Sequence, residues 1–182
     1  MRSDVHDRPI DVAALLTEVA SPANGAAILF VGTVREVNDG RAVTGIDYTA
    51  YTAMARRELA AIVREAAERF EIAHLVVEHR LGHLALGEAS VAVAVAHARR
   101  ARAYEASRYL VEELKRRVPI WKREHYADGT REWVDPSAAH ESIEPATGGP
   151  PPDRASRAAG LGSRLLVADE SPPTAIDSQP RS

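Results

Sequence analysis

The chain has 182 residues, which is room for one domain and little more. A composition that is 45% hydrophobic and 27% charged suits a globular protein with a packed core, and a formal charge of −3 argues against general nucleic-acid binding. The absence of cysteine excludes an internal disulfide, thiolate metal site or persulfide. No apolar run approaches the roughly 20 residues that span a membrane, and the polar N-terminus lacks a signal-peptide apolar region, so we expect a cytoplasmic protein.

The first seventy residues predict alternating helices and strands. Apolar residues recur there at helical spacing or in β-prone runs, and turn-forming residues separate these segments. The predicted elements are a helix over Ile10–Val19 that is N-capped by Asp11, a buried strand over Ala26–Arg35, a loop over Glu36–Arg41 with a turn at Asp39-Gly40, a strand over Val43–Tyr51 and a helix over Ala53–Phe70.

The second half continues with strands over Ala73–Leu81 and Ser90–Ala98 and a long helix over Ala101–Val118, which Pro119 ends. Two more strands, over Ile120–Tyr126 and Arg131–Val134, close the predicted domain. The helix is expected to bury one face, formed by Tyr104, Ser107, Val111, Leu114 and Val118. We therefore predict an α+β domain in which two long helices pack on a mixed sheet.

The composition changes sharply near Pro136. Residues 137–182 are rich in Pro, Ser and Gly, with GGPPP at 148–152. Such a segment buries too little apolar surface to offset its ordering entropy. We predict a folded domain over residues 1–136 and a mostly disordered tail over 137–182.

Two lysines flank the predicted helix end at Pro119. Lys115 lies on the last helical turn and Lys122 just beyond the break, so the two ammonium groups can converge on one anion. The alternative is a solvated basic helix end, because cations favour helix C-termini.

Three arginines also lie at predicted element ends. Arg35 ends a buried strand and opens a loop, and Arg99 and Arg100 precede the long helix, whose free N–H groups can bind an anion. The alternative for each is a solvated surface residue. The seven histidines show no helical metal-binding spacing, so we expect no metal, and Trp121 and Trp133 are interpreted as core or interface residues.

Several segments together resemble the catalytic large subunit of molybdopterin synthase. They are FVGTVR (Phe30–Arg35), HRLGHLALGE (His79–Glu88), AYEASRYLVEELKRRVPIWKRE (Ala103–Glu124) and EWV (Glu132–Val134), and their order holds over roughly residues 10 to 135.

The resemblance implies an α/β-hammerhead fold and a homodimer within a heterotetramer, with a small ubiquitin-like sulfur-carrier subunit at each end. The carrier's C-terminal Gly-Gly thiocarboxylate would deliver sulfur to a small-molecule pterin, cyclic pyranopterin monophosphate, to form the dithiolene of molybdopterin. No cofactor, nucleic acid or membrane is expected to take part. A chain without cysteine needs such an external sulfur donor.

By the same resemblance, Lys115 is the main catalytic lysine and Lys122 binds and polarises the same groups. The implied substrate contacts come from Thr33, Val34, Arg35, Arg123 and Glu124.

One departure concerns the helix start, where the family usually has a His-Arg pair that binds the substrate phosphate. Arg99 and Arg100 occupy these positions here. Arg99 can bind phosphate, but it cannot act as a neutral base near pH 7. The departure leaves an alternative open, namely a non-catalytic carrier-binding homologue that has lost turnover.

Overall fold

The computed structural model describes residues 1–134, so the predicted domain boundary at 136 and the predicted disordered tail lie outside the described residues. The predicted α+β class is confirmed. In chain order the elements are β1 (Arg2–His6), α1 (Val12–Val19), β2 (Ala26–Thr33), β3 (Val37–Asn38), β4 (Arg41–Ala50), α2 (Thr52–Phe70), β5 (His74–Arg80), β6 (Gly82–Ala85), β7 (Ala89–His97), α3 (Arg100–Arg117), β8 (Ile120–Tyr126) and β9 (Arg131–Val134). No helix in this part of the chain is both long and apolar enough to cross a membrane.

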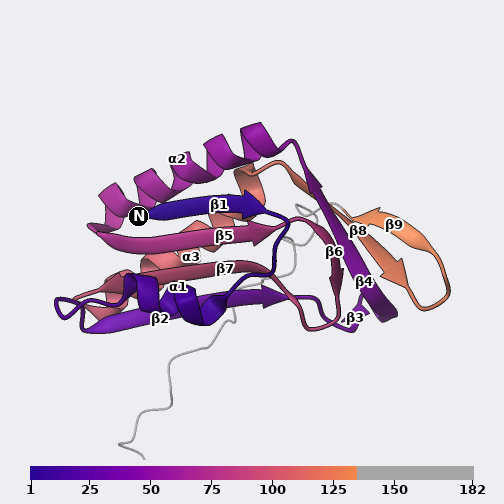
Figure 1. Cartoon of the computed structure of the whole chain (residues 1–182), viewed down its shortest axis with the longest axis horizontal. Coiled ribbons are helices and arrows are strands. Elements are labelled where there is room, and N and C mark those ends of the chain that lie inside the picture. The colour runs from indigo at the N-terminus through magenta and orange to yellow at the C-terminus, as the bar shows by residue number, and fades with distance from the viewer. Residues whose placement is uncertain (135–182) are drawn as a thin grey trace, which may run out of the picture. The chain divides into compact units, whose positions relative to one another are not determined.

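The strands divide over two sheets rather than the single mixed sheet expected from the sequence. The first has the order β1-β5-β7-β2, with β1 parallel to β5 and the other pairs antiparallel. The long helices α2 and α3 cover one face and α1 covers the other (Figure 1). Strand alternation explains this arrangement, because Val93 and Val95 face the long helices while Ala92 and Ala94 face α1.

The second sheet has the order β3-β4-β8-β9, and β6 also pairs with β4. Helix α3 leads into this sheet through a sharp turn at Pro119, where the sequence predicted that the helix ends. Val118 is the extended C-cap of α3, and β8 begins at Ile120. The predicted turn at Asp39-Gly40 is confirmed, since both residues have positive φ, 47° and 76°, and connect β3 to β4.

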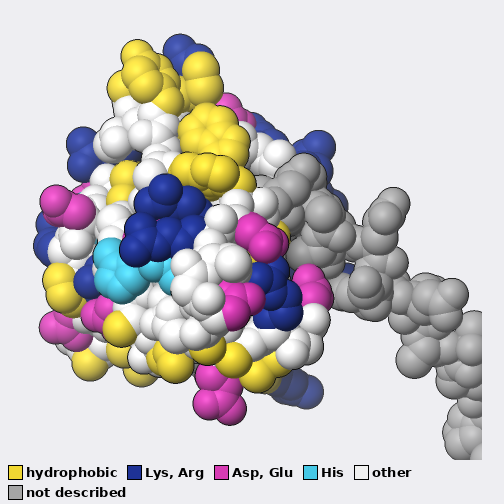
Figure 2. Space-filling view, turned by 90° about the vertical axis from the view of Figure 1, so that its right-hand side faces the viewer, with side chains coloured by type: hydrophobic (Ala, Val, Ile, Leu, Met, Phe, Trp, Pro, Cys, Tyr) yellow, Lys and Arg dark blue, Asp and Glu magenta, His cyan; other side chains and the backbone are white. Residues whose placement is uncertain are grey.

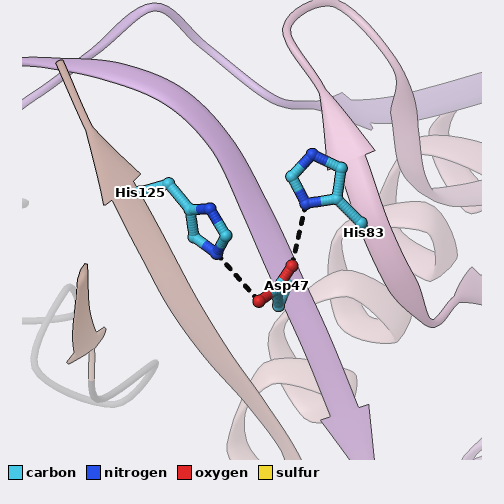
Figure 3. Close-up of side chains that lie close together, drawn as sticks. All are labelled: Asp47, His83 and His125. Carbon is cyan, nitrogen blue, oxygen red and sulfur yellow. Dashed lines mark hydrogen bonds and ion pairs between the residues drawn. The ribbon is translucent and has the colours of Figure 1, made fainter. Parts of the chain in front are cut away.

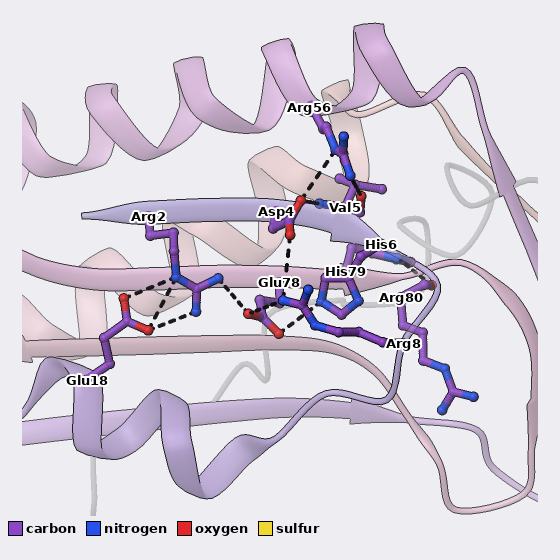
Figure 4. Close-up of polar contacts among 10 residues, drawn as sticks. All are labelled: Arg2, Asp4, Val5, His6, Arg8, Glu18, Arg56, Glu78, His79 and Arg80. Atoms are coloured by element: carbon purple, nitrogen blue, oxygen red, sulfur yellow. Dashed lines mark hydrogen bonds and ion pairs between the residues drawn. The ribbon is translucent and has the colours of Figure 1, made fainter.

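The N-terminal strand β1 was not predicted. Its backbone pairs with β5, and its side chains are tied to the buried Glu78 of that strand (Figure 4). Arg2 Nη1 donates to Glu78 Oε1 at 2.6 Å, and His6 Nε2 lies 3.0 Å from Glu78 Oε2. Arg2 also binds Glu18 of α1 at 2.8 Å. These contacts fix β1 to both its neighbouring strand and the short helix.

The predicted buried face of α3 was wrong at Tyr104, which is 60% exposed. The face that packs on α2 and the sheet is instead formed by Ala103, Ala106, Ser107, Leu110 and Leu114. Alanine at two of these positions lets the helix approach the layer beneath it closely, whereas a tyrosine there would hold it away.

Candidate active site around Glu124 and Lys115

Glu124 is the centre of a polar network within the second sheet. Its side chain is buried, with the residue 2% exposed, and it accepts three hydrogen bonds. Lys122 Nζ donates to Oε1 at 3.0 Å, while Asn38 Nδ2 and the Tyr126 hydroxyl donate to Oε2 at 3.0 and 2.9 Å. Lys122, Glu124 and Tyr126 alternate along β8, so they lie on the same face of the strand.

The Glu124 carboxylate is held in its ionised form. Burial alone would raise the pKa of Glu124, but the hydrogen bonds from Lys122 and Tyr126 and the charge of Lys122 outweigh burial and lower it. A buried carboxylate with three donors is a rigid acceptor, and it fixes the direction in which the Lys122 ammonium lies.

Arg35 joins the same network through Asn38. Its guanidinium donates to Asn38 Oδ1, and the Asn38 amide donates in turn to Glu124. Three residues predicted from the sequence, Arg35, Lys122 and Glu124, are therefore brought together. Asn38 was missed because EVNDGR was interpreted as a loop. Tyr126 was missed although its spacing of two from Glu124 on a predicted strand indicates the same face.

Within the described residues, Lys115 is not part of the hydrogen-bond network around Glu124. It is exposed on the last turn of α3 and lines an open groove of about 730 Å³ at the Pro119 corner. The other lining residues are Thr49, Arg116, Arg117, Val118, Pro119, Ile120, Trp121, Trp133 and Val134. Trp121 and Trp133 are 51% and 60% exposed, so the core interpretation of these tryptophans was wrong.

The charges beside Lys115 are already paired. Arg116 binds Glu113 at 2.5 Å, and Arg117 binds Glu58 and Glu65 at 2.6 and 2.5 Å. Within residues 1–134, by contrast, Lys115 forms no ion pair. The groove therefore presents one cation that an incoming anion can bind without displacing an internal partner.

Thr33 and Val34 lie at the end of β2, ahead of Arg35. Thr33 is exposed. Val34 is buried, its N–H donates to the Glu88 carbonyl at 3.1 Å, and its carbonyl accepts from the Gly87 N–H at 2.8 Å. The Val34 N–H is thus hydrogen-bonded within the chain, and the implied contact of Val34 with a substrate stays a prediction.

Arg99 and Arg100 do not approach Lys115 within one chain. Arg99 is the N-cap of α3, and Lys115 follows it by 16 residues. At 1.5 Å per residue this separation is about 24 Å along the helix axis. Arg123 is also engaged elsewhere, since it donates to Asp47 Oδ2 at 2.8 Å and stacks over Trp133.

The fold and these side chains define an α+β protein that has a groove lined by Lys115 and, separately, a buried carboxylate network around Glu124. Residues 5–117 match the family model described as MoaE protein, and the chain belongs to this family. A molybdopterin synthase catalytic subunit from Oryza sativa subsp. japonica is 41% identical over 167 residues, covering 89% of this chain and 86% of the relative. One from Halalkalibacterium halodurans is 41% identical over 133 residues, covering 73% and 85%.

Solved structures show the same fold. The X-ray structure of molybdopterin synthase from Staphylococcus aureus has a TM-score of 0.68 and 32% identity, covering 72% of this chain and 95% of that one. A molybdopterin cofactor biosynthesis protein E from Burkholderia multivorans has a TM-score of 0.60 and 31% identity, covering 74% and 87%. The family and these relatives assign the chain to molybdenum cofactor biosynthesis.

Proposed function

We propose that the chain is the catalytic subunit of a molybdopterin synthase and acts as a sulfurtransferase. It would take sulfur from the thiocarboxylated C-terminus of a small ubiquitin-like carrier and transfer it to cyclic pyranopterin monophosphate. The MoaE family membership supports this proposal. So does the absence of cysteine, because the sulfur must then come from another molecule.

The main support for the proposal is that lysine occurs at only two positions in the chain. Of the 23 lysine and arginine residues in the chain, only Lys115 and Lys122 are lysines. Arginine serves at every other cationic position, including the ion pairs next to Lys115. A compact ammonium is therefore used only at the two positions that the family resemblance assigns to chemistry. Lysine differs from arginine in being a point charge that can lose its proton.

The groove suits the C-terminal segment of a carrier. Two exposed tryptophans, Trp121 and Trp133, line it and offer apolar surface that an extended peptide can cover. Lys115 offers an unpaired cation for the terminal thiocarboxylate. In this account Lys115 stabilises the negative charge on the carrier terminus and on the anionic intermediate as sulfur leaves. Lys122, held by Glu124, and Arg35, held by Asn38, would contact the pterin substrate.

Arg99 and Arg100 would act in the site of a second copy of the chain. Because about 24 Å of helix separates Arg99 from Lys115, neither arginine can share an anion with Lys115 of its own chain. We propose that in a homodimer each chain supplies these arginines to the partner's site, where they bind the substrate phosphate.

Product formation tests the function. Purified chain, thiocarboxylated carrier and cyclic pyranopterin monophosphate are mixed, and molybdopterin is quantified for the wild type, Lys115→Ala and Arg108→Ala. Arg108 is an exposed cation on the same helix, paired with Glu112. We expect Lys115→Ala to lose on the order of 10² to 10³ in rate, as when an electrostatic stabiliser is removed, and Arg108→Ala to match the wild type. Carrier binding without any product from the wild type would instead establish the non-catalytic carrier-binding homologue.

A further inference from the structure

Three side chains from neighbouring strands meet on the outer face of the second sheet (Figure 3). They are Asp47 of β4, His83 of β6 and His125 of β8. Asp47 lies directly opposite His83 in the β4–β6 register, and His125 lies opposite Gly45 in the β4–β8 register. Three hydrogen-bonded strands therefore hold the three groups, and the residues predicted to act on carrier and pterin do not include any of them.

We propose that Asp47, His83 and His125 form a binding site for a divalent transition-metal ion, with Zn²⁺ as the best match. Two imidazoles and one carboxylate are a common protein ligand set for zinc, and three protein ligands leave a fourth position open. His83 is exposed, so the open position faces solvent. This inference does not depend on the proposed sulfur transfer.

The ligand atoms already lie near the spacing that the metal needs. His83 Nδ1 is 2.8 Å from Asp47 Oδ1, and His125 Nε2 is 2.8 Å from Asp47 Oδ2. One ligand atom from each of the three residues lies within 4.8 Å of the others. Zinc bonds of about 2.0–2.2 Å at tetrahedral angles place neighbouring ligand atoms about 3.3 Å apart. The two 2.8 Å contacts would lengthen by about half an ångström, and the longest separation, at most 4.8 Å, would shorten by up to about 1.5 Å. Side-chain rotation of the exposed His83 can supply such movements.

The backbone beneath the cluster is shaped for the His83 ring. A Cβ atom at Gly45 would lie 2.8 Å from His83 Cε1 and 3.1 Å from His83 Nε2, so any side chain there would displace the imidazole. Glycine lets the ring lie over β4, with its centroid 5.2 Å from that of His125. Figure 2 looks onto this end of the molecule and shows histidine side chains at the surface beside a group of Lys and Arg side chains.

Arg123 would compete with a metal ion for the Asp47 carboxylate. Its guanidinium donates to Asp47 Oδ2 at 2.8 Å, so a cation already neutralises the carboxylate and occupies one of its oxygens. The Arg123 side chain is 37% exposed and can turn away into solvent. Metal and Arg123 thus compete for Asp47, and removal of the arginine charge should tighten metal binding.

Calorimetric titration with Zn²⁺ tests the site on the full chain without an affinity tag, and Co²⁺ is followed in parallel by its visible ligand-field absorption. We expect one bound ion per chain and an affinity that falls on the order of tenfold or more in His83→Gln and in Asp47→Asn. Arg123→Gln should raise the affinity. His74→Gln, which removes a histidine from β5 in the other sheet, serves as the matched control and should bind as the wild type does.

The opposite changes in the Asp47 and Arg123 variants separate ligation from a loss of folding, because a folding defect would weaken binding in both. Thermal unfolding of each variant is recorded alongside. The proposal is overturned if the wild type does not bind Zn²⁺, or if the His83 and Asp47 variants bind it with wild-type affinity.

Discussion

Lys122 and Glu124 lie two residues apart on one face of β8, and the Lys122 ammonium donates a 3.0 Å hydrogen bond to the buried Glu124 carboxylate. Tyr126 and Asn38 complete the coordination of the same carboxylate. The lysine is therefore oriented by a group that cannot move. Its position relative to a substrate is fixed by the strand and not by solvent-exposed rotamers.

Glu124→Gln tests this positioning role. The amide keeps the shape of the side chain but loses the charge and turns one acceptor into a donor beside Lys122. We expect the free energy of unfolding to fall by about 1–3 kcal/mol, as for an unsatisfied buried partner, and turnover to fall with it. Urea denaturation measures the free energy of unfolding, and molybdopterin formation measures turnover.

Glu132→Gln is the matched control for that variant. Glu132 lies opposite Glu124 on the neighbouring strand β9, but it is exposed and pairs with Arg41. Its replacement should leave stability and turnover unchanged. An equal loss in both variants would mean that Glu124 has no special role.

The pH dependence of stability should include a contribution from His79. Burial lowers the pKa of His79 to about 4, whereas an unfolded histidine titrates near 6.5. Between these values the unfolded state binds more protons than the folded state, so stability is lost as the pH falls from 6.5 to 4, by up to about 3 kcal/mol. His79→Gln should show a smaller loss over this range in denaturation at a series of pH values. An unchanged pH profile would remove His79 as a cause.

Mixed dimers test the contribution of Arg99 from a second copy. Arg99→Ala and Lys115→Ala should each be inactive alone. When the two chains are unfolded together and refolded at equal amounts, half of the dimers are hybrids, and each hybrid has one intact site. About a quarter of the wild-type turnover should return. No recovery would place Arg99 and Lys115 in the same site of one chain or in no common site.

The sequence predicted the elements that carry strong periodicity. Helices α2 and α3, strands β2, β4, β5 and β7 and the break at Pro119 all lie within two residues of their predicted bounds. Strand β1 was missed because only Val5 in RSDVH is apolar, and its pairing with β5 joins segments more than 70 residues apart. No local pattern contains such a contact.

The candidate site was predictable where residues share a strand. Lys122 and Glu124 lie on one face of β8, as alternation requires, and Arg35 reaches them through Asn38. Arg99 lies at the opposite end of α3 from Lys115, as the predicted helix bounds already imply, so the two side chains are not joined within one chain. The metal-site cluster was missed because Asp47, His83 and His125 come from three strands whose register the sequence does not reveal.

Whether the chemistry requires a lysine at position 115 is tested by turnover of Lys115→Arg, measured together with the affinity for the thiocarboxylated carrier. Arginine keeps the charge at the groove, so carrier affinity should change by no more than about threefold. We expect molybdopterin formation nevertheless to fall on the order of 100-fold, because the compact ammonium is lost. Wild-type turnover by Lys115→Arg would contradict the claim that the chemistry requires a lysine at this position.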